Sequence, residues 1–548
     1  MTEADVVDIA RRIHTRDVSL WAAAPEAQSI VGKRLGWLDA PDWLNENREE
    51  LTTWARDIRG QGFARVVVLG MGGSSLAARA LAGVFGKTEQ GLPLVVLDTT
   101  HPAAVTAAAA GLPETLFVSA SKSGTTTEVT ALTAYFYQQV KAERGRAAGE
   151  NFVAITDAGS ALQRYAEAHD FRRCFLNPAD VGGRFSVLTA FGMVPAALLG
   201  LDLDRMFNSA RTARAASRAD TPDADPSALR LGQVMARSAL AGRNKLTLLL
   251  SPQLGAFSVW VEQLVAESIG KSGIGIIPVI DESLPIGAYG MDRFFVAVTL
   301  TGDHTLDETL QALEAAGHEI DHHQLDDRYD LAGEFFRWEF AVAVAGALLA
   351  VNPFDEPDVV SSKQTTRRLL EGKKEEQANS IGEIRDDAGL TLRMPISLVD
   401  EDAGLSGQLL RFFQNAGPTN YLTLMPFLYM TDDVQNALSE LITALRAVLP
   451  LPVILNPGPR YLHSTGQLHK GGPNTGLYLI ITASTDTMLA IPGEPYSFSD
   501  LNNAQASGDF LSLAALNRQV AHLDLGSSPQ QALAAVTAEV QLRWTESA

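Results

Sequence analysis

The sequence contains very little cysteine: Cys174 is the only one among 548 residues. A single thiol excludes a disulfide within the chain and any metal site built from several cysteines. Long apolar runs are also missing, because the longest one, Phe340 to Val351, is too short to span a bilayer. Residues 1–19 are charged and amphipathic and lack the apolar core of a signal peptide. We therefore expect a protein of the reducing cytoplasm.

Positive charge is scarce in this chain. Lysine and arginine together number 44 against 64 acidic residues, which gives a formal net charge of −20. This charge argues against nucleic acid or an acidic membrane as a general partner, so an anionic ligand would need locally placed cations. The ten histidines form no metal-binding motif, and the pair His322-His323 is expected on a solvated turn. We predict no bound metal.

Strand-like apolar runs alternate with helical patterns, which is typical of parallel sheets covered by helices. Two polar stretches, 216–228 and 371–389, are expected to connect domains. The length is too great for one small core. We therefore predict an α/β fold divided into residues 1–225, 226–370 and 390–548, the last a C-terminal α/β domain. The predicted strands are 66–69, 94–97, 116–118, 152–155, 173–175, 246–250, 274–279, 294–299, 421–425, 452–455, 477–481 and 520–523.

Residues 119–130, SASKSGTTTEVT, are unusually rich in small hydroxyl side chains. A strand pattern precedes this stretch and a helical pattern follows it, so it spans a strand-to-helix turn. The free N–H groups and the positive dipole at the start of a helix favour an anion there. Ser121, Ser123 and Thr126 add hydroxyl donors, and Lys122 adds charge. We infer a phosphate-binding turn.

A glycine-rich turn, LGMGGSSLAARAL at 69–81, follows the first predicted strand and opens a helix. A dinucleotide site is one alternative, because Asp98 ends the next strand at about the usual distance. The third glycine of that motif is replaced by Ser75, however, so the match is incomplete. This turn, with Gly73 and Ser74, and the hydroxyl-rich turn together fit one phosphate better than a dinucleotide.

Two charged residues are candidates for catalysis. Arg184 follows Gly183, which lets its backbone approach a ligand, and its charge persists at any working pH. Glu267 shares an apolar helical stripe with Trp260 and Leu264. Burial on such a stripe raises the pKa of a carboxyl group, which suits a general base near neutral pH. A surface arginine and a buried structural salt bridge are the alternatives.

Five segments between residues 66 and 365 form a series: GMGGSS, SKSGTTTE, VGGRFSVLTAFG, AESIGK and NPFDEPDVVSSK. Together, and in this order, they resemble the glucose-6-phosphate isomerase family. Residues 458–476 resemble the isomerase half of transaldolase/isomerase fusion proteins. The resemblance implies two flavodoxin-like sugar-isomerase (SIS) domains, a homodimer and no cofactor. It also implies interconversion of glucose 6-phosphate and fructose 6-phosphate, the small-molecule partners, through a cis-enediol.

The resemblance further implies roles for individual residues. Glu267 would move a proton between C2 and C1, Arg184 would lie beside the enediol, and Lys363 would contact the substrate. Such chemistry needs a positioned carboxylate and a cation near the oxygen that gains charge. The residues expected around the sugar and its phosphate are Gly73, Ser74, Ser121, Lys122, Ser123, Thr126 and Glu128.

The sequence departs from the family pattern at two places. Glu356 stands where the family has glutamine, and residues 268–303 lack the histidine that opens the sugar ring. The next histidine, His304, is expected to cap a helix or to be exposed. We therefore assign ring opening to a glycine-bounded C-terminal loop, although a purely structural loop is the alternative. Its candidates are His463, Gln467, His469 and Lys470, with His469 preferred as the catalytic group and Gln467 as a substrate contact.

Two other functions are alternatives to an isomerase. A non-catalytic sugar-phosphate-binding regulator could share these domains, but Glu267 and Arg184 together favour chemistry. An amidotransferase making glucosamine 6-phosphate would need an N-terminal cysteine, whereas Cys174 lies in the middle of the sequence. We predict an aldose-ketose isomerase, which is an intramolecular oxidoreductase.

Overall fold

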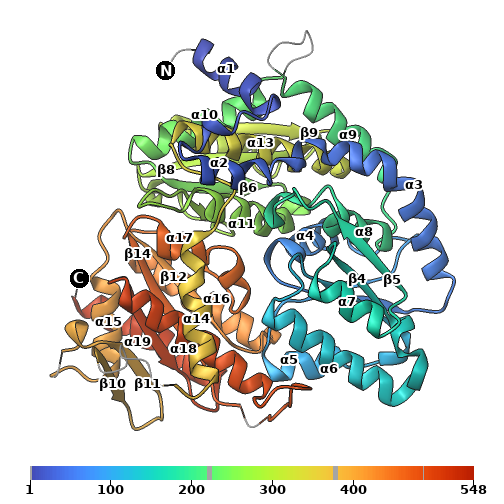
Figure 1. Ribbon diagram of the computed structural model, residues 1–548. Helices are drawn as coiled ribbons and strands as arrows, with labels where there is room; N and C mark the ends of the chain where they lie inside the picture. Colours follow the sequence, from blue (N-terminus) through green and yellow to red (C-terminus); the bar gives the residue numbers. More distant parts are fainter. Residues whose placement is uncertain (1–2, 219–224, 374–379, 401, 486, 548) are drawn as a thin grey trace. The chain divides into compact units, whose positions relative to one another are not determined.

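The computed structural model describes residues 3–218, 225–373, 380–400, 402–485 and 487–547 (Figure 1). The chain forms two compact units. The first comprises residues 1–98, 108–281 and 291–356, and the second comprises 99–107, 282–290 and 357–548. The middle parts of both predicted connectors, 219–224 and 374–379, lie outside the described residues. The three-way division of the sequence stays a prediction.

The first sheet of the first unit has five parallel strands, which are β1 (Arg65–Gly70), β2 (Leu94–Leu97), β3 (Thr115–Ala120), β4 (Phe152–Asp157) and β5 (Arg173–Asn177). Their spatial order is β2-β1-β3-β4-β5, so the chain reverses its winding direction between β1 and β3. β1, β3 and β4 are buried along almost their whole length, as expected for parallel strands covered on both faces.

The second sheet repeats this winding with four parallel strands, which are β6 (Lys245–Leu250), β7 (Ile277–Val279), β8 (Arg293–Leu300) and β9 (Ile320–Leu325), in the order β7-β6-β8-β9. Sequence analysis missed β9. His322 and His323 lie in this strand, so the expected solvated turn was wrong. β9 pairs on one side only, and its exposed polar side chains hide the strand pattern.

Helix α13 (Leu331–Leu348) lies in the core that both sheets of the first unit share. It packs against α9, α10 and α11, and it is buried from Leu331 to Gly346 because its sequence is apolar on nearly all sides. The other helices of this unit are α1 (Glu3–His14), α2 (Pro25–Gly32), α3 (Ala40–Arg59), α4 (Leu76–Phe85), α6 (Thr127–Arg144), α7 (Ala161–Ala168), α8 (Ala190–Leu198), α9 (Leu203–Ala216), α10 (Ser227–Leu240), α11 (Ser258–Ile269) and α12 (Asp307–Ala315).

The second unit contains a sheet of six strands around its own core. The strands are β10 (Ile381–Arg385), β11 (Thr391–Pro395), β12 (Tyr421–Pro426), β13 (Val453–Leu455), β14 (Gly476–Thr482) and β15 (Gln519–Asp524). Their order is β10-β11-β15-β14-β12-β13, with β10 and β11 antiparallel at one edge. The helices are α5 (Pro102–Ala108), α14 (Val360–Leu370), α15 (Leu405–Gln414), α16 (Asp432–Val448), α17 (Gly466–Gly471), α18 (Phe498–Ala515) and α19 (Pro529–Ser547).

These sheets confirm the predicted α/β fold with parallel strands. β10 and β11 were missed because β10 is polar and falls within the stretch predicted as a charged connector. Within the described part of the chain, no helix is long and apolar enough to cross a membrane. The same residues contain no group of three or more histidines, cysteines and carboxylates that could hold a metal ion.

A buried carboxyl group on α13 provides a test of this core. Glu339 is fully buried, and neither of its oxygens has a hydrogen-bond partner among the described residues. Burial raises the pKa of Glu339 well above its usual range. Stability is therefore lost as the pH rises from the unfolded pKa towards the folded one, by about 1.4 kcal/mol for each unit of the shift. Glu339→Gln should raise the melting temperature more at pH 8 than at pH 5.

Glu334, on the same helix, is the matched control. Burial opposes its ionisation, but Arg337 and His323 outweigh burial and lower the pKa of Glu334 to about 2. Glu334→Gln removes a paired charge and should lower the melting temperature at both pH values. An effect of Glu339→Gln that is equal at pH 5 and pH 8 would contradict the assignment.

Candidate active site

Three predicted turns of the first unit lie at the carboxyl ends of its strands. The turn after β1 contains Gly72–Ser74, the turn after β3 spans 121–126, and the turn after β5 contains Gly183–Phe185. β1 and β3 are neighbours, and the winding reverses between them. Ligands bind at such reversal points in open α/β sheets. The fold therefore brings the two predicted phosphate-binding turns to one place.

The turn at 121–126 is held by its own side chains. Ser121 Oγ accepts a hydrogen bond from the Gly124 N–H at 3.2 Å and donates one to Thr126 Oγ1 at 3.1 Å. Gly124 has a φ of +69°, and a Cβ there would lie 2.4 Å from the backbone nitrogen of Leu162. Only glycine fits this position, so the turn is fixed by both hydrogen bonding and packing.

Two helices begin at these turns without a side-chain cap. Thr126 is the N-cap residue of α6 and Ser75 that of α4, yet neither side chain accepts a hydrogen bond from its helix. The first N–H groups of both helices are therefore available at the same edge of the sheet, together with the positive ends of two helix dipoles. Ser123 is exposed, and its Oγ lies 2.9 Å from Thr125 Oγ1. This arrangement suits a phosphate group.

Lys122 does not offer an unpaired charge at this turn. Its Nζ forms an ion pair with Asp157 and donates to the backbone oxygen of Ala179 at 3.2 Å. Burial raises the pKa of Asp157, while Lys122 and Arg34 oppose the rise. Arg34 also approaches the third turn, since a Cβ on Gly182 would lie 3.9 Å from its Cδ. Arg34 is thus a second cation here, which sequence analysis missed because no motif surrounds it.

Gly73 lets the first and third turns meet through their backbones. A Cβ on Gly73 would lie 2.2 Å from the backbone oxygen of Gly183 and 2.7 Å from the nitrogen of Arg184. Gly183 differs, because no described atom lies within 4 Å of the position of its own Cβ. The space beside Gly183 is therefore open, while Gly73 is needed for packing.

Arg184 is the centre of the charged cluster, and its side chain is only 4% exposed. Nε donates to Ser268 Oγ at 2.9 Å, and Nη1 lies 3.1 Å from oxygens of both Glu267 and Glu356. Nη2 donates to two backbone oxygens of the segment 353–355, at 2.7 and 2.8 Å. Arg184 thus donates four hydrogen bonds and forms an ion pair with Glu267. Burial opposes the charge, but the two glutamates raise the pKa of Arg184.

Glu267 is held at both oxygens of its carboxylate. Oε1 faces Arg184, and Oε2 accepts a hydrogen bond from Gln263 Nε2 at 2.9 Å. Burial raises the pKa of Glu267, Arg184 opposes this, and the neighbouring charge of Glu356 raises it further, so that the pKa lies above its usual value. The side chain is 12% exposed. A partly accessible carboxylate with a raised pKa has the properties of a general base.

Helix α11 ends before Gly270, as predicted, and it packs against the first and third turns. The apolar stripe alone does not single out Glu267, however. Glu262 was expected on another face but is also buried, because α11 is covered on nearly every side. The position of Glu267 beside Arg184, rather than the stripe alone, distinguishes it.

Lys271 and Asp355 complete the cluster, and sequence analysis missed both. Lys271 Nζ lies 2.9 Å from Asp355 Oδ1 and donates to backbone oxygens of the segment 352–356. Burial lowers the pKa of Lys271 to about 8, and Arg184 contributes to the decrease. Arg184 and Lys271 therefore both hold the segment 352–356 through its backbone oxygens. The available signal was the position of Lys271, four residues after Glu267 and just beyond the helix.

Other predicted residues have different surroundings. Glu128 is buried in the first turn of α6. Lys363 and Gln467 belong to the second unit, where Lys363 is exposed on α14. Gln467 is buried, and its Oε1 accepts a hydrogen bond from the Asp358 N–H at 2.9 Å. Their proposed substrate contacts stay predictions.

His469 also belongs to the second unit, within α17. The expectation of a loop was therefore wrong, because these residues form a short helix bounded by glycines. His469 is 1% exposed, with its ring centroid 5.7 Å from that of Tyr461 and 4.9 Å from that of Tyr478. Burial lowers the pKa of His469 well below its usual range, so its imidazole is neutral. Its ring-opening role stays a prediction.

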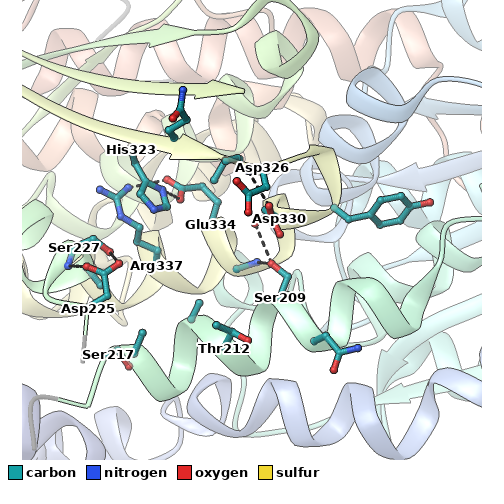
Figure 2. Close-up of a pocket in the computed structure, with 18 of the residues that line it drawn as sticks. Ser209, Thr212, Ser217, Asp225, Ser227, His323, Asp326, Asp330, Glu334 and Arg337 are labelled. Carbon is teal, nitrogen blue, oxygen red and sulfur yellow. Dashed lines mark hydrogen bonds and ion pairs between the residues drawn. The ribbon is translucent and has the colours of Figure 1, made fainter. Parts of the chain in front are cut away.

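A separate cavity of about 640 Å³ in the first unit contains none of the predicted site residues (Figure 2). His323, Glu334 and Arg337 point toward one another on its wall. Glu334 lies 2.7 Å from both His323 Nδ1 and Arg337 Nη1. Because the buried carboxylate of Glu334 is already held by Arg337 and His323, we assign this cavity no part in the chemistry.

Sequence comparison identifies relatives of this chain. The family model described as Phosphoglucose isomerase matches residues 48–276. Glucose-6-phosphate isomerase from Symbiobacterium thermophilum is 31% identical over 391 residues, which cover 61% of this chain and 86% of the relative.

Two solved structures share the fold. A hypothetical protein from Thermus thermophilus superposes with a TM-score of 0.57 at 25% identity, over 67% of this chain and 94% of that one. A glucose-6-phosphate isomerase from Chlamydia trachomatis gives a TM-score of 0.51 at 20% identity, over 66% of this chain and 78% of that one. The predicted fold class is thereby confirmed.

The contact between the first and third turns can be tested with two matched glycines. Gly73→Ala places a methyl group against the backbone of Gly183, whereas Gly183→Ala places one in open space. We expect the first change to lower the free energy of unfolding by about 1–3 kcal/mol, as overpacking does. The second should change it by much less. Equal losses in chemical unfolding would show that the two turns do not meet in this way.

Proposed function

The chain belongs to the phosphoglucose isomerase family, and from this premise we propose that it interconverts glucose 6-phosphate and fructose 6-phosphate. The observation that carries the proposal is the carboxylate of Glu267, held on Arg184 and carried by a helix that packs against the first and third turns. This is an aldose-ketose isomerisation, in which a hydrogen moves between adjacent carbons and the carbonyl group moves the opposite way.

Binding of the phosphate positions the substrate. The N–H groups at the start of α6, the hydroxyls of Ser121, Ser123 and Thr126, and Ser74 surround the phosphate, with Glu128 near the sugar. The phosphate takes no part in the bond changes, so its binding energy serves to orient C1 and C2 at Glu267.

The proton transfer then proceeds in two steps from the open-chain aldose. Glu267 removes the proton from C2, and the electron pair forms a C1=C2 double bond while negative charge develops on the C1 oxygen. In the second step the O2 proton passes to the C1 oxygen, the C2 carbonyl forms, and Glu267 returns its proton to C1. The product is the ketose, and the enzyme is unchanged.

Arg184 supports these steps through its charge. Its guanidinium donates four hydrogen bonds to the protein and pairs with Glu267, so it stabilises the enediol mainly through its fixed charge. A fixed charge in a buried site needs no reorganisation when the substrate charge develops. Glu356, on the same guanidinium nitrogen, adjusts the proton affinity of the base.

The proposal extends to features that follow from the family resemblance. Lys363 contacts the substrate, and His469 opens the sugar ring with Gln467 beside it. The protein acts as a homodimer in the cytoplasm, and the reaction uses no cofactor, because the hydrogen stays within one molecule.

Replacing the base tests the proposed function directly. Glu267→Gln should lower kcat by about 10²–10⁴-fold, since general bases contribute that much. The same substitution should stop exchange of the C2 hydrogen with deuterated solvent. NMR of fructose 6-phosphate and glucose 6-phosphate monitors this exchange. Glu262→Gln, on the same helix, is the control and should retain turnover. Undiminished exchange in Glu267→Gln would refute the assignment of the base.

The second glutamate predicts a change in pH dependence. Arg184, Lys271 and Glu356 are the charged groups facing Glu267, and Glu356 raises the pKa of Glu267. Glu356→Gln removes that negative charge, so the pKa of Glu267 falls and the acidic limb of the pH profile of kcat/KM moves to lower pH. Glu314→Gln, an exposed change on α12, is the control. A limb that stays in place or moves to higher pH contradicts the coupling.

A further inference from the structure

The sheet of the second unit has its own reversal of winding. β12 and β14 are neighbours in the middle of this sheet. After β12 the chain adds β13 on the outer side of β12, and after β14 it adds β15 on the outer side of β14. Their carboxyl ends therefore flank the point at which open α/β sheets bind ligands. In the first unit the corresponding point holds the proposed phosphate-binding turns. The reversal point of the second unit has no part in the proposed isomerisation.

A cavity of about 410 Å³ opens at this point. Its walls are the segments that follow β12, β14 and β15, together with residues near His101. Every lining residue belongs to the second unit, and none is part of the charged cluster around Arg184. The cavity is therefore a second candidate site, separate from the proposed active site in both position and composition.

One end of the cavity is aromatic. The rings of His101 and Tyr429 are nearly parallel, with an angle of 21° and a centroid distance of 5.9 Å. Tyr429 is 37% exposed, which leaves ring surface available to a ligand. Exposed aromatic faces beside such cavities stack on planar rings, and this stacking tolerates different bases.

His101 provides a directed donor at that end. It is 7% exposed, and its Nδ1 accepts a hydrogen bond from the Ala103 N–H at 3.3 Å. Burial lowers the pKa of His101 to about 4, so the ring is neutral near pH 7. The single ring proton must then be on Nε2, for which no partner is present in the described part of the chain. His101 lines the cavity, so Nε2 is available to donate a hydrogen bond to a ligand acceptor there.

The opposite end of the cavity is the start of α19. Pro529 is its first residue and has no N–H, and the Ala532 N–H bonds to the backbone oxygen of Ser528 at 3.0 Å. The N–H groups of Gln530 and Gln531 lie between them and are not capped by any described side chain. Free N–H groups at the positive end of a long helix suit a phosphate.

Hydroxyl and carboxylate side chains lie between the two ends. Ser484 and Thr485 follow β14, and Asp433 lies in the first turn of α16 after β12. A carboxylate in this part of a doubly wound fold can accept hydrogen bonds from ribose hydroxyls. The aromatic end follows β12 and the helix start follows β15, two strand spacings or about 10 Å away.

We propose that this cavity binds a nucleoside monophosphate, with its base on Tyr429, its ribose at Asp433 and its phosphate at the start of α19. The order of an aromatic face, a hydroxyl-binding middle and an anion-binding end matches the order of base, ribose and phosphate. No lysine or arginine lines the cavity, which favours a monophosphate over more highly charged nucleotides. This inference does not depend on the proposed isomerase activity.

Isothermal titration of the full chain with adenosine monophosphate tests the proposal. Binding of one molecule per chain is expected, and saturating fructose 6-phosphate should not displace it. Adenosine, which lacks the phosphate, and ribose 5-phosphate, which lacks the base, should each bind at least about tenfold more weakly. Tyr429→Ala should weaken binding of adenosine monophosphate by a similar factor, whereas Tyr429→Phe should retain it. Isomerase turnover of both variants should be unchanged, which also shows that they are folded.

Three results would overturn the proposal. One is the absence of binding at millimolar adenosine monophosphate. Another is that Tyr429→Ala leaves binding unchanged, or that fructose 6-phosphate abolishes binding. In either case the nucleotide would occupy a different site. The third is binding of ribose 5-phosphate as tight as that of the nucleotide, because the aromatic end would then have no role.

Discussion

The site depends on one buried guanidinium. Arg184 joins three segments that are far apart in the sequence: its own turn, helix α11 through Glu267 and Ser268, and the segment 353–356. A buried charge costs several kcal/mol unless hydrogen bonds and opposite charges compensate it. Four hydrogen bonds and two glutamates compensate it here, so moving any one segment would leave part of the charge unpaired. This requirement fixes the geometry around the proposed base.

The same arrangement explains how a carboxylate can remain a base in a buried place. Arg184 alone would favour the ionised form of Glu267 and weaken its proton affinity, whereas burial and Glu356 act the other way. Glu356 therefore belongs to the balance of charges. Lys271 holds the segment that carries Glu356, so the balance also depends on this lysine.

Sequence reasoning identified most buried strands and the three turns, because apolar runs, glycines and clustered hydroxyls are local signals. It missed β9 and β10, whose polar composition reflects their position at the edges of sheets. It also assigned the charge of Lys122 to the phosphate, whereas the structure pairs it with Asp157. Such pairings, like the approach of Arg34 to the third turn, join distant segments and leave no pattern in the sequence.

Both units place a helix N-terminus and small hydroxyl side chains at the reversal point of a parallel sheet. In the first unit the third turn adds Arg184 and Glu267, which supply the groups needed for proton transfer, whereas the cavity of the second unit has an aromatic wall and no such pair. The same fold thus provides one place proposed for chemistry and one proposed for binding alone. The difference lies in the side chains that surround each helix start, as expected where sites vary on a common fold.

A crystal structure with a stable hexose-phosphate analogue of the enediol would test the central claim most directly. The account predicts the phosphate at residues 121–126 and the carboxylate of Glu267 within hydrogen-bond distance of the atoms that represent C1 and C2. Arg184 should keep its contacts with Glu267 and Glu356. An analogue bound with Glu267 out of reach of both carbons would contradict the account.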